Sequence, residues 1–429
     1  MAESSEVARV AERPRAGRRW TVVALLFAAM VFNYVDRQTL GLLKPTISGE
    51  MSWTNSDFAN VVLCFQGAYA LSYLVFGRIV DRFGARWGLG IAFAVWSASQ
   101  ILISGARGLG QFMLARAALG VGEAGAFPGA VKAVAAWFPQ KERAFANGLF
   151  NAGTNIGAIV TPLAIPAITL AFGWRAAFVA TGLAGLVWLP IWLLVYREPR
   201  AHAKISAAEL AWIEQDQPAP TVEKMPWGRL LRLRQTWAYA LGKFLSDPIF
   251  GMYLTWLPDF LGRRHGLNLK TFGLPLAAIY LFSDVGSVGG GWLSSHLLRR
   301  GWTVNRARKI TLLVCALCAT PVMLAGWVSN LWLAVAVISL AAAAHQGFSA
   351  TLYALPADLL PRNAVGSTIG LGGMLGAVGG MLMSKYTGWT LDHARGYTPV
   401  FLVAGCAYLC ALTVVHLLSP RLQPAAPSL

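Results

Sequence analysis

Residues 20–43 read WTVVALLFAAMVFNYVDRQTLGLL, an apolar stretch that is long enough to cross a bilayer as one helix, which takes roughly 20 residues. Asp36 and Arg37 lie inside this stretch, where a charge costs about 2.5–3.5 kcal/mol per residue even on lenient insertion scales. Charges at that depth persist only where they face a protein interior or a water-filled path. The stretch therefore predicts a membrane protein with a charged site inside its helix bundle.

The rest of the chain repeats this apolar pattern. Of its 429 residues 56% are hydrophobic and only 13% are charged, a balance typical of a polytopic membrane protein. We expect an all-α membrane protein with twelve transmembrane helices. The predicted spans are 20–43, 56–77, 88–106, 110–133, 143–166, 174–196, 236–260, 273–297, 306–327, 331–355, 365–388 and 398–418.

The net charge of +17 could suggest a nucleic-acid partner, but the distribution of the charge argues against one. An even number of crossings places both termini on one side, and most of the 36 Lys and Arg residues fall on that side. The positive-inside rule then predicts cytoplasmic termini. We expect no nucleic acid among the partners.

The longest hydrophilic stretch divides the predicted spans into six and six. Two six-helix halves around a cytoplasmic loop are typical of transporters built from internal repeats, so we expect two pseudo-symmetric bundles. The expected parts are a cytoplasmic N-terminus (1–19), an N-terminal bundle (20–196), a linker (197–235), a C-terminal bundle (236–418) and a cytoplasmic C-terminus (419–429).

Two further charges lie in the fourth span. Arg116 and Glu123 are seven residues apart and therefore share a helix face. Together with Asp36 and Arg37 they form a candidate charge network in the N-terminal half. One interpretation is a static network that only locks the helices; the other is a site for protons and substrate, which is the usual role of intramembrane charges.

The functional interpretation has a specific chemistry. A carboxylic acid buried in a low-dielectric cavity can hold a proton near neutral pH. An arginine stays charged and offers a planar fork to a substrate carboxylate. Protonation of Asp36 or Glu123 would free Arg37 for an external anion, so proton and anion would bind cooperatively.

Polar side chains on other spans offer candidate substrate contacts. The fifth span carries asparagines at helical spacing, and the second and tenth spans carry further polar groups. Plain hydrogen bonding between helices is the alternative for all of them. The candidates are Gln66, Tyr69, Asn151, Thr154, Asn155, Gln346 and Ser349.

Two sequence features suggest moving parts. Asp247 and Pro248 lie inside the seventh span, where a proline favours a kink that is useful in a gate. The stretch 77–86, GRIVDRFGAR, carries charges that could clamp the two halves together in one conformation, although ordinary anchoring by basic residues is the alternative. Its candidate gating residues are Gly77, Asp81, Arg82 and Arg86.

Several function classes lack their signatures. The sequence has no glycine-rich phosphate loop, no zinc spacing and no nucleophile elbow. Cys315 and Cys318 lie in an apolar run without partner ligands. We therefore expect no metal, no cofactor and no enzymatic activity.

The stretch 77–86 resembles the cytoplasmic loop motif of the major facilitator superfamily. Within that superfamily, residues 33–37 (NYVDR) and 122–128 (GEAGAFP) resemble the anion/cation symporter branch. Three further stretches resemble its bacterial hexuronate (galacturonate/glucuronate) proton symporters: 132–143 (KAVAAWFPQKER), 150–154 (FNAGT) and 344–346 (AHQ).

This resemblance implies a transporter of sugar-acid monoanions in the bacterial inner membrane, acting as a monomer. It implies that Arg37 binds the substrate carboxylate with Tyr69 and Thr154 nearby, and that Asp36 and Glu123 carry the coupling protons. We also expect Tyr34 to contact the substrate and Arg116 to take part in the proton coupling. A symporter of another organic anion (an aldonate, an aromatic acid or a dicarboxylic acid) and a non-transporting sensor remain the alternatives.

Overall fold

The computed structural model describes residues 17–214, 225–393 and 395–422, and the regular elements in these ranges are helices. The first half of the chain forms one bundle. Its helices are α1 (Arg18–Met51), α2 (Asn55–Ser104), α3 (Leu109–Glu123), α4 (Ala126–Trp137), α5 (Gln140–Phe172) and α6 (Trp174–Val195).

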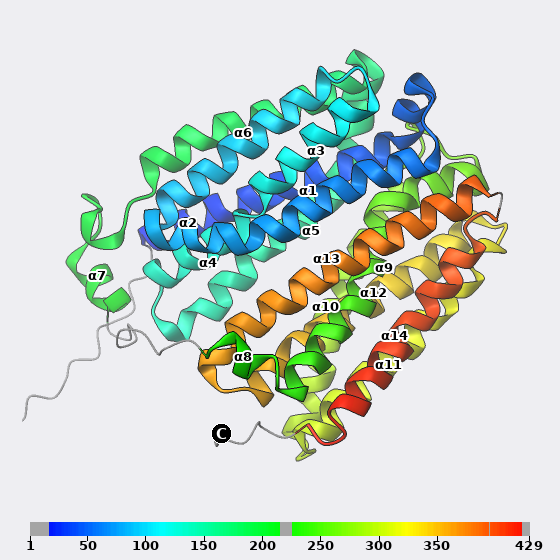
Figure 1. The fold of residues 1–429 in the computed structure, drawn as a ribbon. Coiled ribbons are helices and arrows are strands. Elements are labelled where there is room, and N and C mark those ends of the chain that lie inside the picture. The colour runs from blue at the N-terminus through cyan, green and yellow to red at the C-terminus, as the bar shows by residue number, and fades with distance from the viewer. Residues whose placement is uncertain (1–16, 215–224, 394, 423–429) are drawn as a thin grey trace, which may run out of the picture.

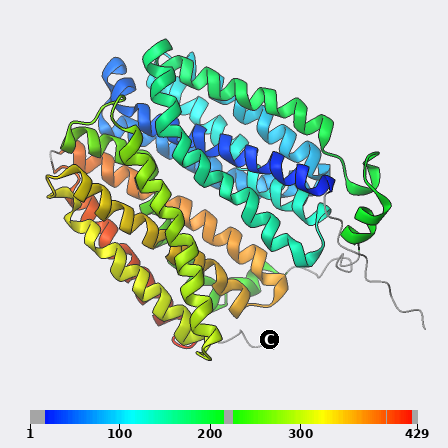
Figure 2. The ribbon, with the colours of Figure 1, turned by 180° about the vertical axis from the view of Figure 1, so that it is seen from behind.

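The second half of the chain forms a second bundle, which lies beside the first in both ribbon views (Figures 1 and 2). Its helices are α9 (Arg234–His265), α10 (Gly273–Arg299), α11 (Val304–Ala319) with η2 (Thr320–Gly326), α12 (Leu331–Leu359), α13 (Arg362–Asp392) and α14 (Thr398–Leu418). Contacts of α2 with α13, α1 with α9 and α5 with α10 join the two bundles.

Nine helical segments of the described chain are apolar and long enough to cross a membrane. Three more passages complete the expected twelve: the first part of α2, the pair α3 and α4, and α9. The helices α3 and α4 have only 15 and 12 residues because the fourth passage is broken, and α9 carries Lys243 and Asp247 inside its length. The predicted fold class is confirmed.

Two predicted spans differ in detail from the structure. The second and third spans are separate passages within α2 that meet at a break at Gly84, which has φ 74° and ψ 170°. Only glycine adopts this backbone conformation readily, and the break turns the chain back into the membrane. The fourth span is two helices rather than one, because α3 ends at Glu123 and α4 begins at Ala126.

The linker contains η1 (Pro199–Ala201), α7 (Ala207–Glu214) and α8 (Trp227–Leu230). The carboxylate of Glu209 in α7 accepts hydrogen bonds from the backbone N–H groups of Arg18 and Arg19, each at 3.1 Å. The first N–H groups of a helix have no acceptor within the helix itself, so a carboxylate at this end of α1 is stabilising. The linker is thus fastened to the N-terminal bundle.

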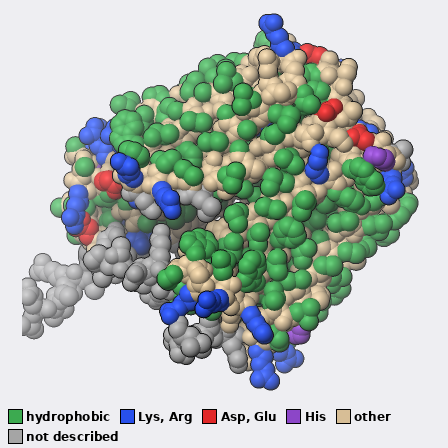
Figure 3. Space-filling view, in the orientation of Figure 1, with side chains coloured by type: hydrophobic (Ala, Val, Ile, Leu, Met, Phe, Trp, Pro, Cys, Tyr) green, Lys and Arg blue, Asp and Glu red, His purple; other side chains and the backbone are tan. Residues whose placement is uncertain are grey.

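The outer surface is suited to lipid. Apolar side chains cover most of the face in Figure 3, and charged groups gather mainly near its two ends. Large side chains such as Leu114, Phe172, Leu194 and Val288 are more than 70% exposed. A soluble monomer would hide surface of this kind, so its natural contact is the bilayer.

Candidate functional site

A cavity of about 420 Å³ lies between the two bundles. Its walls come from α1, α2, α3, α4 and α5 of the first bundle and from α9, α10, α12 and α13 of the second. Its volume falls within the range of ordinary small-molecule sites, roughly 300–1,000 Å³. All nine residues that the sequence analysis expected to contact substrate line it: Tyr34, Arg37, Gln66, Tyr69, Asn151, Thr154, Asn155, Gln346 and Ser349.

Arg37 presents the cavity with a cation that already has a partner. Its Nε lies 2.5 Å from Oε2 of Glu123, which is fully buried, whereas the Arg37 side chain is 24% exposed. The guanidinium is 4.6 Å from the centroid of the Tyr69 ring, and Tyr34 and Phe65 also face it at 5.7 and 5.6 Å. Aromatic faces stabilise and orient a guanidinium without cancelling its charge, so Glu123 is the group that masks it.

Glu123 owes its position to the break in the fourth span. It is the last residue of α3, and the turn through Ala124 and Gly125 lets the chain resume as α4. Gly122 allows this end of α3 to approach α2, since a Cβ there would lie 2.5 Å from the backbone N of Trp96. The helix end therefore packs deep in the bundle and delivers its carboxylate to Arg37.

Asp36 lies on another side of α1, away from the cavity lining. Only 1% of the residue is exposed, and its Oδ2 accepts a 2.6 Å hydrogen bond from Nε1 of Trp96. Its other oxygen, Oδ1, has no hydrogen-bond partner among the described residues. Asp36 is thus a buried acid behind the cavity wall, and it forms no ion pair with its sequence neighbour.

Arg116 lines the cavity but forms no ion pair in the described structure. Its guanidinium is 4.6 Å from the centroid of Phe65, and its Nε and Nη1 atoms are buried without hydrogen-bond partners. The expected four-membered network is therefore one direct pair, Arg37 with Glu123, and two charged groups that stand near it.

The second bundle contributes a cluster that was not among the predicted substrate contacts. Lys243 Nζ lies 2.7 Å from Oδ2 of Asp247 and 4.0 Å from the centroid of Tyr353. His345 stacks on Phe250 with ring centroids 4.8 Å apart. Lys243 could have been found as a cation inside an apolar span, and Tyr353 as the next residue after Ser349 at a helical spacing of four.

The predicted gating residues fall in two places. Asp247 and Pro248 lie within α9, which remains helical through both of its prolines, and Asp247 faces the cavity. In the motif 77–86, Arg86 donates to the carbonyl of Leu193, which fastens α2 to α6 inside one bundle, and Arg82 is exposed. Gly77 and Asp81 also lie in α2, but their surroundings fall outside the described structure.

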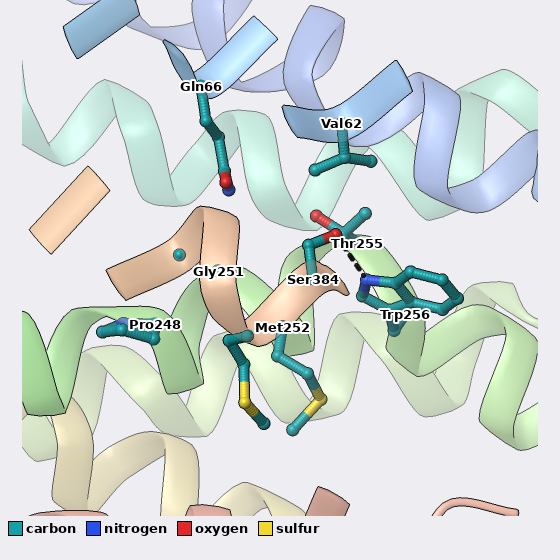
Figure 4. Close-up of a pocket in the computed structure, with 10 residues that line it drawn as sticks. Val62, Gln66, Pro248, Gly251, Met252, Thr255, Trp256 and Ser384 are labelled. Carbon is teal, nitrogen blue, oxygen red and sulfur yellow. Dashed lines mark hydrogen bonds between the residues drawn. The ribbon is translucent and has the colours of Figure 1, made fainter. Parts of the chain in front are cut away.

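Beyond the cavity, α2, α9 and α13 close on one another (Figure 4). A small gap there is lined by residues such as Val62, Met252 and Ser384 and leaves no space for a water molecule. Nε1 of Trp256 donates to Oγ of Ser384 at 3.3 Å across this layer. The layer separates the cavity from the helix ends at Met51, Asn55, His265 and Asp392.

At those helix ends, polar groups join the two bundles. Lys44 Nζ of α1 lies 2.7 Å from Oδ1 of Asp259 in α9, and both side chains are at most 5% exposed. Asp259 also accepts from Tyr397 at 2.6 Å and from Arg263 at 2.8 Å. We call the end of the molecule that carries Lys44, Asp259, Arg263 and Tyr397 the closed end.

A second contact at the closed end is a helix cap that crosses between the bundles. The carboxylate of Asp392, at the end of α13, accepts hydrogen bonds from the backbone N–H groups of Asn55 and Ser56 at 3.0 and 2.9 Å. It thus satisfies the first donors of α2 from the other half of the protein. The polar contacts of the closed end and the packed layer below it shut this side of the cavity.

Comparison with known proteins agrees with this architecture. Residues 26–384 match the Major Facilitator Superfamily. The chain is 30% identical over 405 residues to the hexuronate transporter of Escherichia coli (strain K12), covering 93% of each chain. It is 30% identical over 415 residues to the D-galactonate transporter of Escherichia coli O6:H1 (strain CFT073), covering 94% of each.

The fold also has solved counterparts. The crystal structure of a bacterial homolog to the human lysosomal transporter Spinster superposes with a TM-score of 0.79 at 18% identity, covering 96% of this chain and 99% of that one. The shared architecture, the matched family and the full-length relatives confirm the resemblance that the sequence motifs indicated. The chain belongs to the Major Facilitator Superfamily and is a multi-pass membrane transport protein.

Proposed function

We propose that the chain imports a sugar-acid monoanion, a hexuronate such as galacturonate or glucuronate, together with protons by alternating access. The Arg37–Glu123 pair in the cavity wall is the observation that carries the proposal. A guanidinium offers two parallel donors to a carboxylate, and here a protein carboxylate occupies one of its nitrogens. Substrate and Glu123 therefore compete for the same cation.

A proton resolves this competition. When Glu123 is neutral it no longer holds Arg37 by charge, and an incoming carboxylate can take its place. Asp36, buried behind the wall beside Trp96, is the second acid available for a proton. Binding of proton and anion then favour each other, and the coupling free energy is reciprocal.

The remaining wall suits a polyhydroxylated cargo. Asn151, Thr154 and Asn155 on α5 and Gln66 on α2 face Gln346 and Ser349 of α12 across the cavity. Amides and hydroxyls both donate and accept hydrogen bonds, as sugar hydroxyls require. The full-length relatives named for hexuronate and D-galactonate support sugar acids as the cargo class.

The cycle of binding also needs a way to open and shut. The closed end seals one side of the cavity, and separation of Lys44 from Asp259 would open it. We propose that the closed end faces the outside of a bacterial inner membrane and that both termini are cytoplasmic. One proton per monoanion moves no net charge; two protons carry +1 inward and gain about 2.3 kcal/mol per 100 mV of membrane potential.

The test is uptake of labelled galacturonate into proteoliposomes under an inward proton gradient. Arg37→Ala should abolish uptake, and retained uptake would remove Arg37 from the site. Glu123→Gln mimics the neutral acid, so it should keep counterflow exchange and lose uphill accumulation. Undiminished accumulation in Glu123→Gln would rule out Glu123 as a proton carrier.

The protein offers a matched control pair. Glu50 and Arg175 form an ion pair of 2.7 Å outside the cavity, where both side chains are more than 40% exposed. Glu50→Gln and Arg175→Ala make the same chemical changes as the site variants and should leave uptake intact. A competition panel of hexuronates, aldonates, aromatic acids and dicarboxylates then separates the proposed cargo from its alternatives.

A further inference from the structure

The cavity contains a second masked cation on the wall opposite Arg37. Lys243 of α9 lines the cavity, although only 2% of its side chain is exposed, and its Nζ is 2.7 Å from the carboxylate of Asp247 one helical turn away. The Asp247 side chain is 27% exposed. Asp247 is therefore more accessible to a ligand in the cavity than Lys243 is.

The position of Asp247 depends on a glycine in the facing helix. A Cβ at Gly376 of α13 would lie 2.7 Å from Oδ2 of Asp247, closer than such contacts allow. Because Gly376 has no side chain, the carboxylate of Asp247 has room to lie beside Lys243.

The charges of the two walls then balance. On the N-terminal side, Arg37 and Arg116 are balanced by Glu123 and the buried Asp36 behind the wall, and on the C-terminal side Lys243 is balanced by Asp247. This inference rests on the proposed function, in which one proton on the N-terminal wall leaves a single positive charge for the cargo. A monocarboxylate matches that charge, whereas a second carboxylate at the C-terminal wall would be buried beside Asp247, where Lys243 is already paired, which is unfavourable.

We propose that Asp247 determines the charge of the cargo. By masking Lys243 it makes the C-terminal wall a neutral hydrogen-bonding surface for the hydroxyl end of a monocarboxylate sugar acid. The same masking rejects sugar acids that carry a carboxylate at both ends. Removing the charge of Asp247 exposes Lys243 as a second carboxylate site.

The experiment compares two open-chain acids that differ at one end only. Galactonate has a carboxylate at one end and a hydroxymethyl group at the other; galactarate has a carboxylate at both. Their dissociation constants are measured by calorimetry on the purified full chain, with galacturonate as the reference monoanion. Asp247→Asn should raise the affinity for galactarate relative to galactonate by about ten- to hundredfold, the range of one charge-assisted hydrogen bond.

Two further variants locate the effect. The double variant Lys243→Gln with Asp247→Asn should lose the gain, because the unmasked cation is absent. Asp247→Ser should reproduce it, which keeps the test decisive if the asparagine variant does not yield monodisperse protein. An unchanged ratio in both single variants, or a gain that persists in the double variant, would overturn the proposal.

The unsubstituted protein distinguishes this proposal from the proposed function. Failure to bind galacturonate and galactonate would refute the sugar-acid assignment itself. Binding of both monoanions with equally tight binding of galactarate would refute only the masking by Asp247. Binding of the monoanions with weak binding of galactarate, reversed in Asp247→Asn, supports both.

Discussion

Asp259→Asn should loosen the closed end more than Lys44→Met does, although both changes remove the same ion pair. In Asp259→Asn the ammonium of Lys44 stays buried without its carboxylate partner and keeps neutral acceptors such as Asn55 Oδ1, at 2.9 Å. In Lys44→Met the carboxylate of Asp259 still has Arg263 and Tyr397. The two substitutions therefore differ in the charged group that remains buried: an ammonium without a carboxylate in Asp259→Asn, and a carboxylate that keeps a cation in Lys44→Met.

The structure sets the size of the difference. Removing one partner of a buried pair costs about 3–5 kcal/mol, and one retained hydrogen bond offsets about 1–1.5 kcal/mol of that. Asp259→Asn should therefore disfavour the conformation with the closed end by roughly 1.5–4 kcal/mol, or about 10- to 700-fold. For Lys44→Met we expect about 1 kcal/mol, since Asp259 keeps a cation and a hydroxyl donor.

The assay is the distance between spin labels on the two bundles, measured by double electron–electron resonance. The spin labels are attached to cysteines that replace Arg107 and Lys270, which are exposed in loops at the closed end. The five native cysteines are first replaced by serine. Asp259→Asn should populate a longer distance strongly and Lys44→Met weakly. Asp57→Asn is the control, because Asp57 bonds only within its own bundle, to Thr54.

Two results would refute the reasoning. One is a distance distribution in Asp259→Asn that is identical to that of the unsubstituted protein, which would mean that the pair does not hold the bundles together. The other is a larger shift in Lys44→Met than in Asp259→Asn, which would mean that the buried ammonium is less costly than the buried carboxylate.

Three more predictions concern stability. Gly290→Ala should lower the melting temperature, because its Cβ would lie 2.4 Å from Cα of Gly347 where α10 crosses α12, an overpacking worth about 1–3 kcal/mol; Gly289→Ala, with nothing within 4 Å, should not. Trp96→Phe removes the donor to Asp36 and should cost about 1–3 kcal/mol in chemical denaturation, and unchanged stability would contradict that bond. Hydrogen bonds from Arg175 and Trp174 lower the pKa of Glu50. Their stabilisation is therefore present above the ordinary pKa of a glutamate and is lost as the pH falls through the lower folded value. The melting temperatures of the unsubstituted protein and Glu50→Gln should differ at pH 7 and converge below about pH 4; a constant difference would contradict this.

Much of the cavity could be predicted from the sequence because polar residues are conspicuous in apolar spans. Arg37, Asn151 and Gln346 were selected because hydrocarbon does not tolerate them, and the structure places them on one cavity wall or another. Lys243 met the same criterion but was left out of the predicted substrate contacts. Its partner Asp247 was assigned to a gate from the proline beside it, whereas the structure places it in the cavity wall.

The amino-acid order alone was sufficient for the helical membrane fold, its two halves and the identity of most groups that face the interior. These depend on composition within one span, which is local information. Only the packed structure decided which charges meet. Asp36 and Arg37 are neighbours in the chain, yet a rotation of about 100° per residue directs one to Trp96 and the other to Glu123. Lys44 meets Asp259 and Asn55 meets Asp392 across hundreds of residues, because these contacts exist only where the two bundles lie against each other.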